Sequence, residues 1–512
     1  MTRTGVSAAS SIPLLLGLAA VRLAIQFAGI NHYGFFRDEL YYMACGEHLG
    51  WGYVDQPPLI ALLAWLVRHT MGDSMLALRL LPALAGAAMV FLTGVLAREL
   101  GGSRLAQLLA ATVVLFAPAY LAFDSFFSMN AFEPLFWIVC AILAVRIMNG
   151  GSPKLWIAFG LVAGIGLENK HTMLLFGFGL IAGLLLSGHA KVLRSRWVWI
   201  GGAVALVIFL PNLIWEASHG WPQIEVVRNA QQFKNVTIGP LGFLWDDVLF
   251  LHPIALPLWG SGLGWLLFAA EGKRYRFLAF AFLSVLGAFI FLGGKSYYAL
   301  PAYPLLLAAG GVALEDYLAS HAVAWLKVAY PALLVIGALF TLPFGVPILP
   351  VDTLLRYSRS LPYASEVKTE RDATVALPQL YADMFGWDTM AATVASVYHS
   401  LPAVEQADCA VLAGNYGEAG AIDYYGPKLG LPKALSGHNS YFYWGPRNYS
   451  GSCVIVFGER SDEFKSLFAE STVVATTSNP HGMPNEQRVL IYLCRKPRAP
   501  LVELWPNFKM II

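Results

Sequence analysis

The residues with catalytic potential in this sequence are a few charged side chains set between long apolar stretches. Asp38 and Glu39 are neighbours, and Asp124 stands alone between two apolar runs. A carboxylate can serve as a general base if it reaches the proton that it removes. Two carboxylates can also share a divalent cation through oxygen ligands. Asp38, Glu39 and Asp124 are therefore candidate catalytic residues, with Asp38 and Asp124 as candidate ligands of a divalent metal ion.

Each of these acidic residues also has an ordinary structural explanation. The dipole of a helix favours acidic residues in its first turn, and Asp38 and Glu39 begin a stretch of helical composition. Asp124 could cap the short helix that leads into the next apolar run. The sequence alone leaves both explanations open.

Two lysines also lie at the ends of apolar runs. Lys170 is followed by His171, and Lys295 is followed by Ser-Tyr297-Tyr298. Such a lysine could extend to lipid headgroups or hold a phosphate group as a point charge. The Gly-Lys-Ser triplet around Lys295 is not a P-loop, because a phenylalanine stands where the first glycine would have to be. No nucleotide cofactor is therefore expected.

The composition shows what kind of protein must position these residues. The chain has 512 residues, of which 57% are hydrophobic and only 13% are charged. A soluble domain is about 25% charged, so a polytopic membrane protein is indicated. The net charge of +2 gives no basic field for a nucleic-acid partner. Five cysteines are too few for a disulfide scaffold, although one pair among Cys409, Cys453 and Cys494 could form a bridge.

About eleven apolar runs approach the roughly 20 residues that a membrane-spanning helix needs. They are residues 12–30, 75–97, 104–122, 130–149, 154–168, 171–187, 197–215, 247–269, 276–294, 298–316 and 324–346. Basic residues are enriched in alternate loops, which puts the N-terminus on the cytoplasmic side. An odd number of spans then puts the C-terminal region outside, in the periplasm if the source is bacterial. The charged candidates all fall on this outer side of a cytoplasmic membrane.

A domain boundary is expected near residues 347–352, at the proline-rich stretch 344–350. Residues 1–349 would form the membrane domain, with outer loops near 31–74 and 216–246. The first loop has a helix-like stretch at 38–49 and an apolar stretch at 59–67 that is too short to span. Residues 350–512 resemble a small α/β domain, with helical spacing over 377–401 and short buried strands at 410–413, 453–457 and 489–493.

The first-loop pattern resembles that of the polytopic GT-C glycosyltransferases. It reads Arg37-Asp38-Glu39-Leu-Tyr-Tyr, then Gly52-Tyr-Val-Asp55-Gln56-Pro-Pro-Leu. The superfamily includes the protein O-mannosyltransferases, the lipid A aminoarabinose transferase and the Rgt-type galacturonosyltransferases. The similarity continues through Asp124 and Lys170 to the Lys-Ser-Tyr-Tyr-Ala-Leu-Pro segment at 295–301, and thus covers about residues 12–345.

The resemblance implies an outer-face transferase with a polyprenyl-phosphate sugar as donor and a lipid, glycan or protein as acceptor. Asp38 would be the general base, with Asp124 beside it and a shared metal ion. The implied substrate-binding residues are Asp55, Gln56, Lys170, His171, Lys295, Tyr297 and Tyr298. Gln56 is a departure, since the aminoarabinose transferase has a lysine there, and one phosphate-neutralising charge is lost.

The residues also agree with this chemistry on their own. Transfer needs a base for the acceptor hydroxyl, cations or a metal for the leaving phosphate, and an apolar groove for the prenyl chain. Direct attack would invert the anomeric carbon. The main alternative is a transporter or flippase, which would carry ionisable residues near the bilayer midplane within repeats. Midspan charge is scarce here (mainly Arg22 and Arg79) and no repeat is visible. A scaffold protein is a further alternative.

Overall fold

The computed structural model describes residues 11–236, 238–360 and 377–512. The chain divides into two compact units that alternate along the sequence. Unit 1 comprises Met1–Asn31, Leu76–Ile214 and Thr237–Leu349. Unit 2 comprises His32–Met75, Trp215–Val236 and Pro350–Ile512. Residues 32–75 and 215–236, which belong to the two predicted outer loops, therefore pack with the C-terminal region.

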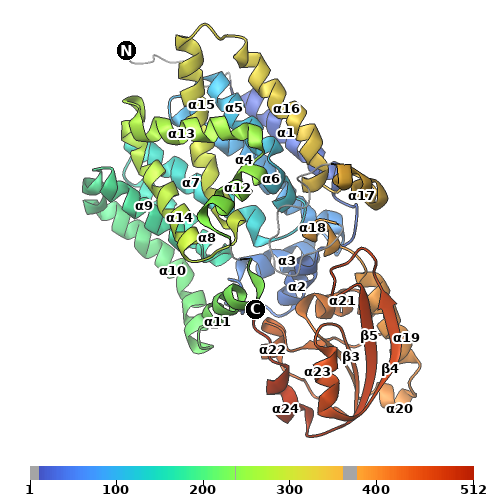
Figure 1. Ribbon diagram of the computed structural model, residues 1–512. Helices are drawn as coiled ribbons and strands as arrows, with labels where there is room; N and C mark the ends of the chain where they lie inside the picture. Colours follow the sequence, from blue (N-terminus) through green and yellow to red (C-terminus); the bar gives the residue numbers. More distant parts are fainter. Residues whose placement is uncertain (1–10, 237, 361–376) are drawn as a thin grey trace. The chain divides into compact units, whose positions relative to one another are not determined.

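Unit 1 is a bundle of helices (Figure 1). Its α-helices are α1 (Ile12–Gly29), α4 (Met75–Glu99), α5 (Arg104–Phe116), α6 (Pro118–Phe123), α7 (Met129–Met148), α8 (Leu155–Asn169), α9 (Met173–Leu186), α10 (Arg196–Ser218), α12 (Pro240–Phe250), α13 (Leu256–Phe268), α14 (Arg276–Phe291), α15 (Tyr303–Ser320) and α16 (Leu326–Gly345). Short 3-10 turns precede four of them: η2 (Ala190–Arg194), η4 (Pro253–Ala255), η5 (Glu271–Tyr275) and η6 (Ser296–Ala302). All eleven predicted apolar runs are thus largely helical.

Fewer of these helices are long enough to cross a membrane than the sequence predicts. Within the described residues, seven helices pass by length and composition, or eight if the pair α12 and α13, bent by 100°, is one span. The predicted spans at 104–122, 154–168 and 171–187 coincide with shorter helices. The first of these is broken before Pro118, because proline disfavours a helical conformation in the residue before it. The estimate of about eleven full spans is therefore corrected to seven or eight.

The surface of unit 1 is suited to lipid. On α10, Trp199 and Val207 are 72% and 68% exposed, and on α16, Val328 is 75% exposed. Contact of these large apolar side chains with lipid acyl chains is favourable, whereas their exposure to water is not. Inside the bundle, the backbones of Gly160 on α8 and Gly201 on α10 approach so closely that a Cβ at either position would overlap the other helix. Small residues at helix contacts are typical of membrane proteins.

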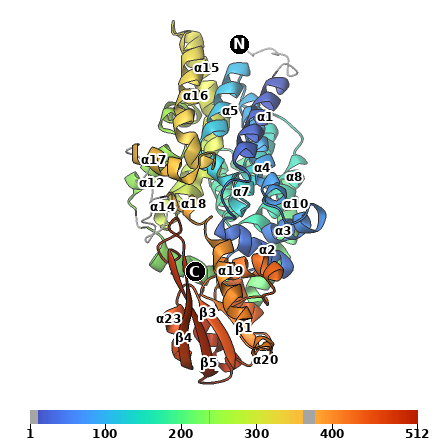
Figure 2. The same ribbon diagram turned by 90° about the vertical axis from the view of Figure 1, so that its right-hand side faces the viewer.

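Helix α5 lies near the centre of one side of this bundle. It packs against α1, α15 and α16, and Figure 2 shows these four helices side by side. Its residues from Leu109 to Leu115 are buried. Unit 1 thus has a continuous apolar interior, in which each polar side chain needs a partner.

Unit 2 combines the two loop segments with the C-terminal region. The first segment forms α2 (Arg37–Glu47) and α3 (Leu59–Thr70), close to the helix-like and apolar stretches read from the sequence. The second forms α11 (Pro222–Asn229) and a π-helical turn, η3 (Ala230–Lys234). The C-terminal region adds α17 (Val351–Ser360), α18 (Gln379–Ala382), α19 (Trp387–His399), α20 (Ala403–Gln406), α21 (Tyr416–Tyr425), α22 (Ser440–Trp444), α23 (Ser461–Phe464) and α24 (Leu501–Leu504), with short turns η7 (Gly426–Leu429), η8 (Lys465–Leu467) and η9 (Trp505–Phe508).

The C-terminal region is built on a mixed five-stranded sheet with strand order β2-β1-β3-β5-β4. The strands are β1 (Cys409–Ala413), β2 (Leu435–Ser436), β3 (Cys453–Phe457), β4 (Phe468–Ser478) and β5 (Arg488–Pro497). β1 pairs in parallel with β2 and β3, whereas β5 is antiparallel to both of its neighbours. β1 and β3 are buried on both faces, with α19 on one side of the sheet and α23 and α24 on the other (Figure 1). The three predicted strands are confirmed; β2 and β4 were not predicted.

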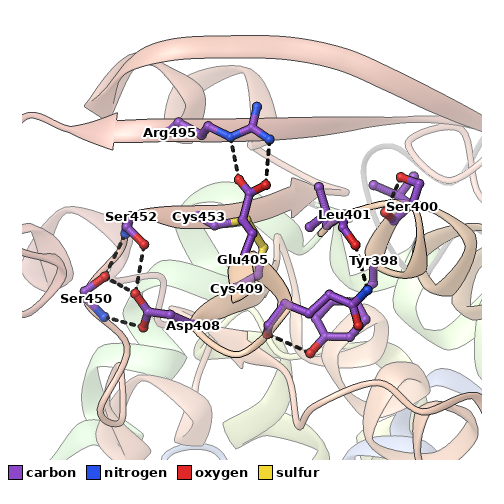
Figure 3. Close-up of a disulfide and its surroundings, with 12 residues drawn as sticks. Tyr398, Ser400, Leu401, Glu405, Asp408, Cys409, Ser450, Ser452, Cys453 and Arg495 are labelled. Carbon is purple, nitrogen blue, oxygen red and sulfur yellow. Dashed lines mark hydrogen bonds and ion pairs between the residues drawn. A yellow bond between two sulfur atoms is a disulfide. The ribbon is translucent and has the colours of Figure 1, made fainter. Parts of the chain in front are cut away.

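A disulfide joins the first residues of the two central strands, Cys409 and Cys453 (Figure 3). Ion pairs and hydrogen bonds surround it: Arg495 on β5 pairs with Glu405 at 2.5 Å, and the Asp408 carboxylate accepts hydrogen bonds from Ser450 and Ser452. Cys494 is free and buried. One pair among the three candidate cysteines therefore forms a bridge, as the sequence allows.

Candidate functional site

The carboxylate of Glu39 is used at the start of α2. The backbone N–H of Phe36 donates to Glu39 Oε2 at 2.8 Å, and the Glu39 side chain is fully buried. A carboxylate at this position satisfies an amide that has no partner within the helix. Glu39 thus occupies the structural role that the helix dipole also favours.

Asp38, one residue earlier, faces a different partner. The hydroxyl of Tyr416, on α21, donates to Asp38 Oδ1 at 2.9 Å. Burial raises the pKa of Tyr416 far above its ordinary value, so the phenol keeps its proton and acts as a donor. Asp38 itself is only partly buried. The bond fixes one oxygen of a carboxylate that solvent or a substrate can still reach.

Asp55 is held in a second hydrogen-bonded chain. The hydroxyl of Tyr41, on α2, donates to Asp55 Oδ1 at 2.7 Å and lies 2.8 Å from Ser440 Oγ on α22. Ser440 Oγ also accepts a bond from the backbone N–H of Val54 at 3.1 Å. Asp38, Tyr41, Asp55, Tyr416 and Ser440 are here called the acid cluster; all five belong to unit 2.

Burial raises the pKa of Asp55 to about 6, with a further contribution from the negative charge of Asp38. The bond from Tyr41 and the positive charge of Lys234 act in the opposite direction. Lys234 ends the π-helical turn η3. Gln56, the predicted neighbour in substrate binding, is fully buried, and its amide lies 3.6 Å from Cys45 Sγ.

The predicted residues of unit 1 form a separate cluster around Lys170. Lys170 Nζ lies 2.8 Å from Glu133 Oε2 and 2.8 Å from Asn130 Oδ1. The Thr172 hydroxyl donates to the other oxygen of Glu133. The ammonium also lies 4.6 Å from the centre of the Tyr298 ring, a cation–π contact. Lys170 is thereby directed into the protein, with its charge matched by one carboxylate.

Lys295 and the adjacent tyrosines lie next to this group. Tyr297 and Tyr298 contact each other edge to face, with ring centres 4.8 Å apart, and Lys295 Nζ lies 5.9 Å from the Tyr297 ring. His171 Nε2 lies 3.0 Å from Asn212 Oδ1. Of the predicted substrate-binding residues, Lys170, Lys295, Tyr297 and Tyr298 are therefore brought together. They are here called the lysine–tyrosine cluster.

Asp124 is buried and paired with a cation inside unit 1. Arg22 Nη2, from the middle of α1, contacts Asp124 Oδ2. Arg22 Nη1 also donates to the carbonyl of Leu115 at 2.7 Å. A side chain at Gly86 would overlap the Asp124 carboxylate, so the absence of a Cβ there makes room for the pair. An arginine within a span must be compensated in this way. The predicted proximity of Asp38 and Asp124 stays a prediction, since the two residues belong to different units.

The residues do not fit the divalent metal that the resemblance suggests. In the described part of the chain, no three His, Cys, Asp or Glu side chains gather where they could hold an ion. Asp124 already has Arg22 as its partner, which a metal would have to displace. Hard divalent cations take six or more oxygen ligands, of which two carboxylates supply few.

Sequence reasoning missed the partners of the predicted residues more than the residues themselves. Tyr416 and Ser440 lie 378 and 399 positions from the first-loop residues that they bind, and no local pattern marks such a contact. Arg22 did carry a signal, because an arginine inside an apolar run needs a buried counter-charge. Within the aromatic run at 441–444, Tyr441 is buried and donates to Asp423 at 2.8 Å.

Comparisons with known proteins agree with the predicted superfamily. Residues 55–215 match the family model described as dolichyl-phosphate-mannose-protein mannosyltransferase. The chain is similar to ArnT from Cupriavidus metallidurans bound to undecaprenyl phosphate, with a TM-score of 0.62 and 14% identity over 95% of this chain and 98% of that one. The apo structure of that ArnT gives a TM-score of 0.61 and 15% identity over the same shares of the two chains. No curated protein matches the sequence significantly.

The family match covers residues 55–215, less than half of the chain, and is in line with the predicted resemblance to the GT-C glycosyltransferases. The chain has the predicted fold, a polytopic helical membrane protein with a small C-terminal α/β region, which is similar to the fold of ArnT.

Proposed function

We propose that this protein transfers a sugar from a polyprenyl-phosphate carrier to a hydroxyl of a lipid, glycan or protein. The reaction would take place on the outer face of the cytoplasmic membrane. The observation that carries the proposal is the acid cluster, in which the accessible carboxylate of Asp38 is held by a phenol that remains protonated. Support comes from the shared fold with an ArnT that binds undecaprenyl phosphate.

In the proposed reaction, the Asp38 carboxylate accepts the proton of the acceptor hydroxyl. The acceptor oxygen forms a bond to the anomeric carbon of the sugar. The bond between that carbon and the phosphate oxygen breaks, and its electron pair leaves with the polyprenyl phosphate. Attack from the face opposite the phosphate inverts the anomeric configuration. General-base assistance of this kind contributes roughly 10²–10⁴-fold.

The lysine–tyrosine cluster is proposed to bind the donor phosphate. Lys170 and Lys295 supply positive charge. The Tyr298 ring restrains the ammonium group of Lys170, and the Tyr297 ring restrains that of Lys295. Cations that are already in place stabilise the charge that develops on a leaving phosphate. The ion pair between Lys170 and Glu133 fixes the lysine before the donor arrives. We also propose that Asp55 contributes to sugar binding and that the prenyl chain lies against the apolar helices.

Glu39 and Gln56 are not given a direct role in this proposal. Glu39 caps α2, and Gln56 is buried inside unit 2. Asp124 is proposed to act through its ion pair with Arg22, by holding α1 against the segment between α6 and α7. The proposal assigns no step to a metal ion, because no three metal-ligating side chains gather within the described residues.

The test is transfer of a radiolabelled sugar from polyprenyl-phosphate donors by the purified protein in lipid nanodiscs. Asp38→Asn keeps the size of the side chain and removes the base, so kcat should fall at least about 100-fold. Asp73→Asn is the matched control, since Asp73 lies in the same loop segment and pairs with Arg68 on the protein surface. Unchanged transfer by Asp38→Asn would exclude Asp38 as the base. Uptake of lipid-linked sugar without a covalent product would instead support a transporter.

A further inference from the structure

Two members of the acid cluster, Tyr416 and Ser440, belong to the C-terminal region. We propose that Tyr416 and Ser440 are positioning residues that hold the first-loop carboxylates Asp38 and Asp55 in their working orientation. This inference rests on the proposed function and adds to it, because it makes the C-terminal region part of the reaction machinery.

Tyr416 is fixed on several sides, so the position of its hydroxyl is well defined. Its ring lies 4.6 Å from the ring of Tyr41 and 4.6 Å from that of His438. The guanidinium of Arg37 lies 5.6 Å from the ring centre. A hydroxyl held this firmly can restrict the Asp38 carboxylate to one rotamer. Preorganisation of this kind is how an enzyme keeps a base within reach of its proton.

The helix that carries Tyr416 is anchored at its first turn. Asn415 caps α21 by accepting from the N–H of Glu418 at 2.9 Å, and Glu418 accepts in return from the N–H of Asn415 at 3.0 Å. Farther along α21, a Cβ at Gly420 would lie 2.8 Å from the backbone of Leu40 on α2. The two helices therefore pack with almost no free space, and Tyr416 cannot move away from Asp38 without moving α21.

Ser440 reaches Asp55 through Tyr41. It contacts the Tyr41 hydroxyl, which donates to Asp55, and it also holds the backbone next to Asp55 by accepting from the N–H of Val54. The Ser440 side chain thus contacts both Tyr41, which donates a hydrogen bond to Asp55, and the backbone segment that carries Asp55. Ser440 has no direct contact with Asp55 among the described hydrogen bonds, so its effect must pass through these neighbours.

The backbone before Ser440 is held in an unfavourable conformation. Asn439 has a φ of +48° and a ψ of −128°. Three hydrogen bonds keep it there: its N–H donates to the carbonyl of Met510, and its side chain bonds both the N–H and the carbonyl of Ile512. A strained residue persists only where its surroundings over-determine it. The C-terminal segment therefore serves to present Ser440 to the first loop.

The first experiment compares two tyrosines of the same helix. Tyr416→Phe removes only the hydroxyl that binds Asp38 and leaves the packed ring in place. Tyr424→Phe is the matched control, because the Tyr424 hydroxyl on α21 also reaches the first-loop segment but donates to a backbone carbonyl, that of Asp73. We expect kcat to fall about 10-fold in Tyr416→Phe with an unchanged KM for the polyprenyl-phosphate donor. A kcat equal to that of Tyr424→Phe would overturn the role of Tyr416.

A second variant tests Ser440 independently, so that poor folding of one protein does not decide the question. Ser440→Ala should also lower kcat, and the loss should be smaller when Tyr41→Phe is already present, because the link through Tyr41 to Asp55 is then already broken and only the bond from Val54 remains to be lost. Residues that act through one another show such non-additive effects. Additive losses from Ser440→Ala and Tyr41→Phe would overturn the role of Ser440.

Failure of the proposed function can be told apart from failure of this inference. If the wild-type protein transfers no sugar from polyprenyl-phosphate donors, the proposed function is wrong. The energetic coupling between Tyr416 and Asp38 can then still be measured by thermal unfolding of Tyr416→Phe, Asp38→Asn and the double variant. Non-additive melting temperatures support the link, and additive ones contradict it.

Discussion

Replacing Asp55 by asparagine should make the protein more stable and less active at neutral pH. Burial raises the pKa of Asp55 to about 6, so the folded protein holds an ionised carboxylate there at an energetic cost. An asparagine oxygen can still accept the bond from Tyr41, but the side chain no longer ionises. If Asp55 is present only for packing, this substitution should be harmless to transfer.

The size and sign of the effect follow from the pKa. The change from the ordinary value of 3.8 to about 6 corresponds to about 3 kcal/mol, since each pKa unit is worth about 1.4 kcal/mol. Asp55 is partly exposed, and solvent screening reduces this to about 1–2 kcal/mol. Because the folded pKa lies above the unfolded one, the stability that this group provides is complete below about pH 4 and is lost as the pH rises through about 6. The advantage of Asp55→Asn is therefore largest near pH 7–8 and disappears toward pH 4.

The assay is thermal unfolding of both proteins in nanodiscs between about pH 5 and 8, with transfer activity measured in parallel. The expected gain at about pH 7.5 is roughly 2–6 °C for a cooperative unit of moderate size. Asp408→Asn is a control of opposite sign: burial raises the pKa of Asp408, but hydrogen bonds from Ser450 and Ser452 outweigh it and lower the pKa overall. That variant should lose stability at neutral pH. A loss of stability in Asp55→Asn, or a difference from wild type that does not change with pH, would refute the reasoning.

Three further predictions concern the ion pair, the disulfide and metals. Lys170→Gln should lower stability by about 3 kcal/mol, because it leaves Glu133 buried without its cation. The double variant Lys170→Gln with Glu133→Gln should regain stability but should not regain binding of the donor. Recovered donor binding would refute the role of Lys170 in binding the phosphate. Replacing Cys409 and Cys453 by alanine removes a bridge between residues 44 positions apart, and it should lower the free energy of unfolding in denaturant by about 4 kcal/mol. An unchanged free energy of unfolding would contradict this prediction. Chelation with EDTA should leave the transfer rate within about twofold of the untreated protein, because two carboxylates are a poor ligand set; a larger loss that zinc or magnesium restores would show a metal site.

The elements that the sequence predicts well are those with a strong local pattern. β1 and β3 were predictable because both faces are buried and their residues are continuously apolar. β4 was missed because it is an edge strand whose residues, such as Glu470 and Ser471, are mostly exposed and polar. The number of full spans was overestimated because hydropathy reports apolar length and not where a helix is interrupted, as it is before Pro118.

The candidate site shows the same division. Lys170 stands out in the sequence as a charge at the end of an apolar run, and Asp38 stands out as an acidic residue of the first-loop pattern. What each of them contacts depends on tertiary packing: Tyr416 is 378 positions away from Asp38, and Glu133 is 37 positions away from Lys170. A contact between distant segments leaves no periodicity or spacing in a single sequence. The residue types of the candidate site could therefore be read from the sequence, and the partners that contact them could not.

The discontinuity of unit 2 has a consequence for biosynthesis. Helix α2 is made early, but its partner α21 begins only after the chain between Glu47 and Tyr416, roughly 370 residues, has been synthesised. At a translation rate of about 5–20 residues per second, the first loop waits roughly 20–75 s before α21 can cover the buried face of α2. During that interval the side chains that α21 covers in the folded protein, such as Leu40, lack their partner. The segment that carries Asp38 therefore reaches its final structure late in synthesis.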